Sequence, residues 1–166
     1  WIRFHLVGGV ADVYMGQVFH VGETTSLGAF ISQDTISDDD VNYFGVEGGF
    51  DLPGLDAEVY LARGDDSVNL FGLNLHHATG NDFGITGKID RASFDAGLDL
   101  TRLSVGMDYT LSPNSVLYGE VGTLRADVYN LSGSQTYVGI GARVNFGAAR
   151  GVTFKRRGLL DMLPGL

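Results

Sequence analysis

The stretch YVGIGARVNF (Tyr137–Phe146) carries the strongest structural signal in this sequence. Every second residue from Val138 to Phe146 is apolar, and the residues between them are polar or small. Successive side chains of a β-strand point to opposite faces, so a period of two predicts a strand with one apolar face and one polar face.

The same alternation recurs along nearly the whole chain. From Arg102 to Leu111, apolar residues at odd positions alternate with polar or small residues at even ones. In the run from Asp12 to Val21 we assign Met15 to the apolar face, with Asp12 and His20 on the polar face. Further complete or partial runs lie at 2–6, 26–32, 43–52, 55–61, 71–76 and 83–90. Val116–Val128 changes phase near Gly122, which predicts a β-bulge.

The connections between these runs predict an up-and-down antiparallel sheet. Tight turns are expected at 22–23, 53–54 and 112–115, where residues that favour turn dihedrals gather. Longer and more polar or acidic connections are expected at 36–40, 64–67 and 130–134. Short and long connections would then occupy opposite ends of about ten strands. No helical period extends beyond a couple of turns, and nothing divides the strands into domains.

Composition excludes several classes of protein. The chain has 166 residues, 25 of them glycine, with 44% hydrophobic and only 19% charged residues, which is too apolar for intrinsic disorder. No apolar run approaches the roughly 18 residues of a spanning helix. The net charge of -9 opposes binding to nucleic acid. There are no cysteines, so disulfides and thiolate metal sites are absent.

The polar face distinguishes a membrane barrel from a soluble sheet. A meander of about ten strands leaves exposed edges unless it closes into a barrel. Glycines such as Gly45, Gly106 and Gly141 lie on the polar face, where they suit a crowded concave wall better than a solvated surface. The aromatics Tyr109, Tyr118 and Phe50 lie close to the tight turns, as interfacial girdles do. We therefore predict an all-β transmembrane antiparallel up-and-down barrel; a soluble lipocalin-like barrel or a β-sandwich is the alternative, because their strands alternate too.

The charged residues of the polar face are the candidate pore-lining residues. Acidic and basic side chains facing each other across water would create a transverse field that penalises apolar solutes. In a narrow barrel they could instead pair with one another and be structural. The candidates are Arg3, Asp12, Glu47, Asp56, Glu58, Lys88, Asp90, Arg102, Asp108 and Arg143.

Two segments resemble the porins of Gram-negative outer membranes. The first is 105–122, in which a VGMDYTLS strand turns into an LYGEVG strand; the second is Tyr137–Phe146, which is similar to the family's closing strand. The resemblance implies that Phe146 is the terminal aromatic read by the insertion machinery. Trimeric porins have about sixteen strands, so ten would form either the C-terminal part of such a barrel or a separate small barrel. The family's long acidic constriction loop is not recognisable here.

The chain continues beyond Phe146, where the porins normally stop. We divide it into a barrel at 1–146 and a C-terminal extension at 147–166. The extension is basic and then apolar. Either the last strand continues to Phe154, or the extension plugs the barrel, docks a partner or remains poorly ordered. Its candidate docking residues are Lys155, Arg156, Arg157, Leu159, Leu160 and Leu163.

Catalytic and metal sites find little support. His76 and His77 are adjacent and would point to opposite faces of a strand, and no serine stands beside them in a catalytic spacing. The acidic runs at 38–40 and 65–66 lack the EF-hand spacing. We therefore expect no enzyme, no metal and no cofactor.

Together these features predict a porin-like passive diffusion channel for small hydrophilic solutes in the bacterial outer membrane. Its partners would be outer-membrane lipid and lipopolysaccharide, with a homotrimer or larger membrane assembly as a further expectation. The alternative is a non-conducting outer-membrane barrel that acts as a structural subunit and docks a partner through its C-terminal extension.

Overall fold

The computed structural model describes residues 2–7, 11–36, 39–80, 82–95, 97–129, 131–144 and 157–162, with the backbone alone for 2–7, 11–14, 19, 36, 39, 66 and 161. Ten β-strands account for most of these residues. They are β1 (Ile2–Val7), β2 (Ala11–Val21), β3 (Thr25–Ile36), β4 (Asp39–Leu52), β5 (Leu55–Gly64), β6 (Val68–Ala78), β7 (Phe83–Phe94), β8 (Leu98–Ser112), β9 (Ser115–Val128) and β10 (Leu131–Val144). Two short 3₁₀ helices, η1 (Asp65–Ser67) and η2 (Leu160–Met162), complete the described structure.

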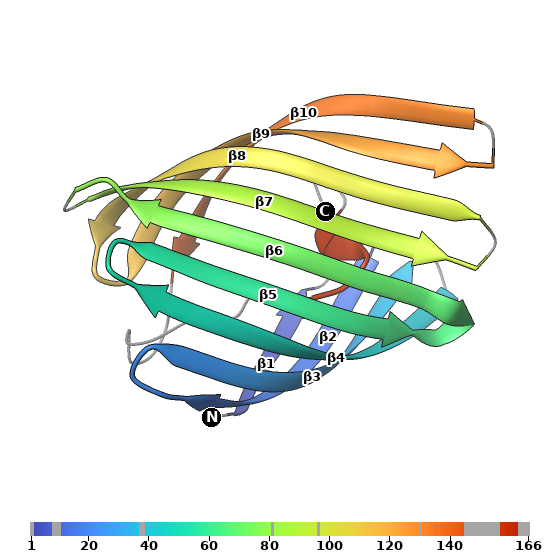
Figure 1. Cartoon of the computed structure of the whole chain (residues 1–166), viewed down its shortest axis with the longest axis horizontal. Helices are drawn as coiled ribbons and strands as arrows, with labels where there is room; N and C mark the ends of the chain where they lie inside the picture. The colour runs from blue at the N-terminus through green and yellow to red at the C-terminus, as the bar shows by residue number, and fades with distance from the viewer. Residues whose placement is uncertain are drawn as a thin grey trace.

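The strands form a single antiparallel sheet in the order of the sequence, from β1 to β10. The sheet curls strongly, so that it has a convex face and a concave face, and the C-terminal segment with η2 lies on the concave side (Figure 1). Among the described residues, no strand pairing joins β10 to β1. The predicted all-β, up-and-down architecture is confirmed, and the curvature is that of a barrel wall.

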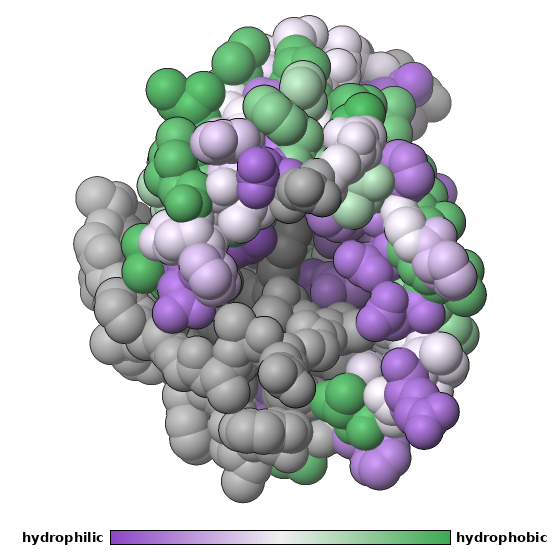
Figure 2. Space-filling view, turned by 90° about the vertical axis from the view of Figure 1, so that its left-hand side faces the viewer, coloured by the Kyte–Doolittle hydropathy of each residue, from purple (hydrophilic) through white to green (hydrophobic). Residues whose placement is uncertain are grey.

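The two faces of the sheet differ sharply in chemistry. Large apolar side chains cover the convex face: Leu103 is 59% exposed and Met107 60%, and Ile31, Phe44 and Leu61 are exposed in the same way on other strands. Polar and charged side chains gather on the concave face, where Glu47, Asp90 and Arg102 are buried. Figure 2 shows hydrophilic residues inside a hollow, and patches of hydrophobic residues on the outer surface. This distribution is the inverse of a soluble barrel's.

The connections differ from our expectation in length. Those at one end of the sheet lie between β2 and β3, β4 and β5, β6 and β7, and β8 and β9; those at the other end are equally short, with η1 between β5 and β6. The predicted length asymmetry is therefore wrong, because β4 and β10 begin within the polar segments that we had interpreted as loops. The predicted bulge near Gly122 is also wrong: β9 pairs with both neighbours without a break at Gly122, and the register shift in its pairing with β8 lies between Thr110 and Ser112.

The phase of β2 is the reverse of the one we predicted. Met15 and Gln17 are buried on the concave face, whereas Val18 and His20 are exposed. The prediction followed the larger number of apolar residues at odd positions and treated Gln17 as an exception. Gln17 in fact donates a hydrogen bond from Nε2 to Oε1 of Glu47 at 3.0 Å, which fixes the phase of the strand.

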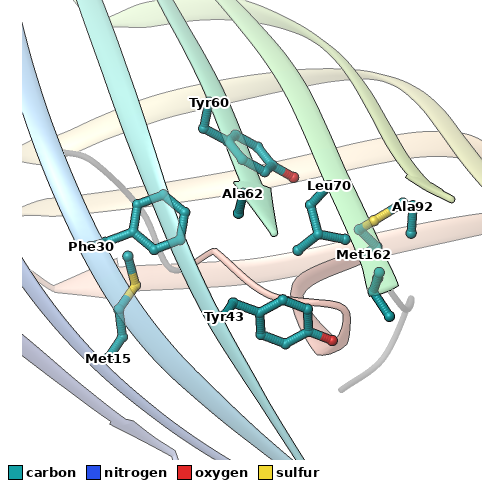
Figure 3. Packing of buried hydrophobic residues seen from close by; sticks show 9 residues of the cluster. Met15, Phe30, Tyr43, Tyr60, Ala62, Leu70, Ala92 and Met162 are labelled. Atoms are coloured by element: carbon teal, nitrogen blue, oxygen red, sulfur yellow. The ribbon is translucent and has the colours of Figure 1, made fainter. Parts of the chain in front are cut away.

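An apolar cluster fills part of the concave side. Phe30, Tyr43, Leu70 and Met162 come together there with other buried side chains, and Met162 belongs to the C-terminal segment (Figure 3). The complete cluster consists of Met15, Phe30, Tyr43, Tyr60, Ala62, Val68, Leu70, Ala92 and Met162. None of the helices in the described part of the chain is long and apolar enough to span a membrane.

Candidate functional site

Aromatic rings on the concave face lie across glycines of the neighbouring strand. Five such cross-strand pairs occur, and in each one a Cβ added to the glycine would come closer than 3.0 Å to the ring. A glycine thus leaves room for its neighbour's ring, which covers the exposed backbone in return. The pairs are Phe30 with Gly45, Tyr43 with Gly64, Tyr60 with Gly72, Tyr118 with Gly141, and Tyr137 with Gly122.

These pairs explain why the polar face is rich in glycine. Gly45 and Gly141, which we expected on a crowded concave wall, each receive a ring. Gly106 is crowded in a different way, because an added Cβ would lie 2.9 Å from the carbonyl oxygen of Gly119. Tyr118, which we expected in an interfacial girdle, instead covers Gly141. Tyr109 does lie on the convex face, where its ring contacts Phe83 at a centroid distance of 4.8 Å.

A buried ion pair crosses from β7 to β8. Arg102 donates to Oδ2 of Asp90 from Nε at 2.9 Å and from Nη2 at 2.7 Å, and the hydroxyl of Tyr60 donates to the other oxygen of Asp90 at 2.9 Å. Asp90 and Arg102 are direct partners in the register, while Tyr60 reaches Asp90 across Gly72. Both oxygens of Asp90 are therefore occupied, as a buried carboxylate requires.

A second ion pair lies one row along the strands. Nζ of Lys88 on β7 contacts Oε2 of Glu120 on β9 at 2.5 Å, and the hydroxyl of Tyr137 on β10 donates to Oε1 of Glu120 at 3.3 Å. Both charged side chains are largely buried. The two ion pairs link three consecutive strands, β7 to β9, by charge-assisted hydrogen bonds, and the hydroxyl of Tyr137 extends the second pair to β10.

His76 lies between two carboxylates on the concave face. Its Nε2 is 3.0 Å from Asp108 on β8, and its Nδ1 is 3.4 Å from Asp56 on β5. The adjacent His77 instead places Nδ1 2.5 Å from the carbonyl oxygen of Gly54 in the turn between β4 and β5. No group of three or more metal-ligating side chains is found within the described ranges.

The remaining acidic candidates, Glu47 and Glu58, contact the C-terminal segment. Nε of Arg157 lies 3.2 Å from Oε2 of Glu47, and its Nη2 lies 3.2 Å from Oε2 of Glu58. The guanidinium also stacks over the ring of Tyr60, 4.6 Å from its centroid. The guanidinium of Arg157 thus lies among side chains of β4 and β5.

The structure thus brings most of the predicted pore-lining residues to one face. Arg143 has the concave phase of Tyr137 and is exposed near the end of β10. Arg3 pairs in register with Gln17, and its side chain lies outside the described ones. Asp12 pairs with Thr35, and its side chain is not described either. We placed Asp12 in the lumen from the predicted phase of β2. Because that phase is wrong, this placement is no longer supported.

The predicted docking residues of the C-terminal extension that the structure describes contact the chain itself. Arg157 and Leu160 are buried in the chain itself, and Leu159 packs against the apolar cluster. Their side chains are not presented to a partner, because charged and apolar groups of the concave face already hold them. Phe146, Phe154, Lys155, Arg156 and Leu163 lie outside the described residues.

Several residues of this network were not predicted from the sequence. Gln17, Asp34, Glu120 and Tyr60 all take part in the buried hydrogen bonds of the concave face. Glu120 lies in the segment for which we predicted a change of phase near Gly122. The period of two is enough to place Glu120 on the polar face. The role of Tyr60 could not be predicted in this way, because it depends on a glycine in the next strand.

Comparison with known proteins agrees with this architecture. No protein-family model and no curated protein matches the chain. Among solved structures, the anion-selective porin from Comamonas acidovorans superposes with a TM-score of 0.59 at 16% sequence identity, over 81% of this chain and 49% of that one. The chain spans about half the length of that porin. The likeness and the inverted distribution of polar residues together show that this chain has a porin-like fold.

Proposed function

We propose that this chain forms the wall of a porin-like channel in the bacterial outer membrane, through which small hydrophilic solutes diffuse passively. The observation that carries the proposal is the contrast between the two faces of β8. Leu103, Val105 and Met107 are exposed on the convex face, while Arg102 and Ser104, which alternate with them, are buried on the concave one. A strand that is apolar outside and polar inside suits lipid on one side and water on the other.

The proposal includes the surroundings of the channel. The apolar convex band would contact outer-membrane lipid, and lipopolysaccharide would surround the end of the barrel that faces outward. Assembly into a homotrimer or a larger membrane complex is part of the proposal, since exposed apolar surface serves for subunit contact as well as for lipid contact. No catalytic step and no cofactor is invoked.

Planar-bilayer recording tests the proposal. The chain, refolded in detergent, should insert and produce discrete conductance steps in potassium chloride, and heat-denatured protein should not. Thr86 and Gly87 are neighbours on β7 that lie on opposite faces: Thr86 stands between His76 and Gly106 in the concave register, and a Cβ on Gly87 would meet open space.

This pair provides a matched test of which face lines the pore. Thr86→Trp should reduce the conductance of each step, because it adds bulk to the concave face, and Gly87→Trp should leave it unchanged. A bilayer that stays silent with well-folded protein would contradict the channel. Equal effects of the two substitutions would contradict the assignment of the concave face to the pore.

The second candidate is a non-conducting barrel with a structural role. The observation in its favour is the apolar cluster around Met162, which fills part of the concave side. Silence of the folded chain in the bilayer, together with intact strand content, is the result that this candidate predicts.

A further inference from the structure

The C-terminal segment occupies the concave side of the sheet and is bound there by several independent contacts. Arg157 is 4% exposed and Met162 0%, and Met162 packs near Tyr43 and Leu70 (Figure 3). The segment comes from the opposite end of the sequence to β2 and β3, which it contacts. It is therefore held by tertiary contacts rather than by continuity with a neighbouring strand.

Hydrogen bonds from side chains of the sheet to the backbone of this segment fix its position. The hydroxyl of Ser32 donates to the carbonyl oxygen of Arg157 at 2.7 Å, and the amide of Leu160 donates to Oδ2 of Asp34 at 2.9 Å. The amide of Arg157 also lies 3.3 Å from the sulfur of Met15. Gly158 allows the close approach, because a Cβ there would lie 2.5 Å from the carboxylate oxygens of Asp34.

The position of the backbone determines where the charge of Arg157 lies. Its guanidinium contacts Glu47 and Glu58 and stacks on Tyr60. Glu47 and Glu58 have little or no exposed side-chain surface, so a cation beside them is worth more than it would be in bulk water. Without Arg157, Glu47 on β4 and Glu58 on β5 would both lose their contact with its guanidinium.

Acidic side chains outnumber basic ones among the described residues of the concave wall. Among the described side chains of the strands, the largely buried cations are Lys88 and Arg102, which contact Glu120 and Asp90. Arg143 adds an exposed cation near the end of β10. The carboxylates of the same face are Asp34, Glu47, Asp56, Glu58, Asp90, Asp108 and Glu120. A wall with excess negative charge raises the local concentration of cations.

We propose that this pore passes small hydrated cations in preference to anions, and that docked Arg157 sets the strength of that preference by compensating Glu47 and Glu58. The proposal rests on the channel function proposed above and names the solute class of the same site. The C-terminal segment then acts as a selectivity element carried by the chain itself. The direction is opposite to that in the name of the superposed porin, which is anion-selective.

Reversal potentials in a potassium chloride gradient across a planar bilayer test the proposal. The reversal potential of the wild-type channel should have the sign expected for a cation-selective pore. Arg157→Gln should raise the permeability ratio of potassium to chloride by about twofold or more, since it uncovers two carboxylates at the wall. Arg157→Lys should stay close to the wild type. Arg63→Gln removes one positive charge from an exposed position on the convex face and should have no effect.

A double variant distinguishes an effect of charge on selectivity from an effect of structural damage to the barrel. Glu47→Gln with Glu58→Gln removes the negative charge of the two side chains that Arg157 contacts and should lower the permeability ratio, the opposite of the effect of Arg157→Gln. A purely structural role of these contacts would shift both variants in the same way. Wild-type channels that prefer chloride, or an Arg157→Gln channel with wild-type selectivity, would overturn the proposal while leaving the channel function intact. Absence of any conductance from the wild-type chain would overturn both.

Discussion

The ring of Tyr60 lies across Gly72, its direct partner on β6, and its hydroxyl reaches over that glycine to Asp90 on β7. Asp90 in turn holds Arg102 on β8. One aromatic side chain therefore couples four strands through a single glycine. The arrangement joins the two features that define the concave face, its glycines and its paired charges.

Substitution of Gly72 should break this coupling. Gly72→Val places side-chain atoms where the Tyr60 ring lies, so the ring must move and its hydrogen bond to Asp90 is lost. We expect the free energy of unfolding to fall by about 1–3 kcal/mol. The measurement is urea unfolding in detergent, followed by circular dichroism. Gly87→Val is the matched control, since open space surrounds an added Cβ there; equal losses in the two variants would contradict the account.

The Asp90–Arg102 pair should be more important than an ion pair at the surface. Arg102→Met leaves a buried carboxylate without its cation, which typically costs about 3–5 kcal/mol. Asp90→Asn combined with Arg102→Met should recover part of the loss, because no uncompensated charge remains. Arg125→Met removes one side of an exposed pair with Asp127 and should leave the unfolding midpoint unchanged. A midpoint for Arg102→Met equal to that for Arg125→Met would show that the buried pair is not coupled to folding.

A charged substitution on the convex face should destabilise the folded chain more, the deeper it lies in the bilayer. Leu103 and Leu111 lie on β8 with exposed side chains on the same face, but Leu111 is next to the turn at 113–114. Leu103→Arg should lower the stability of the folded, lipid-inserted chain by about 2–4 kcal/mol, and Leu111→Arg by about 0–1 kcal/mol. Equilibrium folding into lipid vesicles measures both. A reversed order would place the membrane-embedded band elsewhere on the strand.

Docking of the C-terminal segment should depend on Gly158. Gly158→Val adds atoms against the carboxylate of Asp34 and should displace the segment, exposing the peptide bond after Arg157 to trypsin. We expect cleavage there to accelerate about tenfold or more, since proteolysis requires local opening. Gly80→Val, at an exposed turn with no atom within 4 Å of an added Cβ, is the control. Unchanged cleavage in Gly158→Val would mean that the segment does not need this close approach.

Much of the fold could be predicted from the sequence because alternation is a local property. The run from Arg102 to Leu111 shows its two faces without reference to any other strand, and the structure confirms them. Alternation fails where both faces are apolar. Met15 and Phe30 point toward the C-terminal segment rather than toward water, so the strands that carry them look less regular. The wrong phase of β2 follows from this.

The network of the concave face could be predicted only in part. The charged residues of that face follow from the same period of two, but their partners depend on register, which places Tyr60 opposite Gly72 and Asp90 opposite Arg102. The docking of Arg157 depends on contacts across more than half of the chain. Neither is encoded by a local pattern.

The proposed channel requires that the convex face meets lipid and that the concave face does not. The chain has no cysteine, so single cysteines at consecutive positions from 103 to 108 can carry a spin label without background. In lipid vesicles, we predict that accessibility to oxygen, which concentrates in the bilayer, peaks at 103, 105 and 107 and falls at the positions between them. Odd positions that instead react most with a water-soluble relaxation agent would contradict the account.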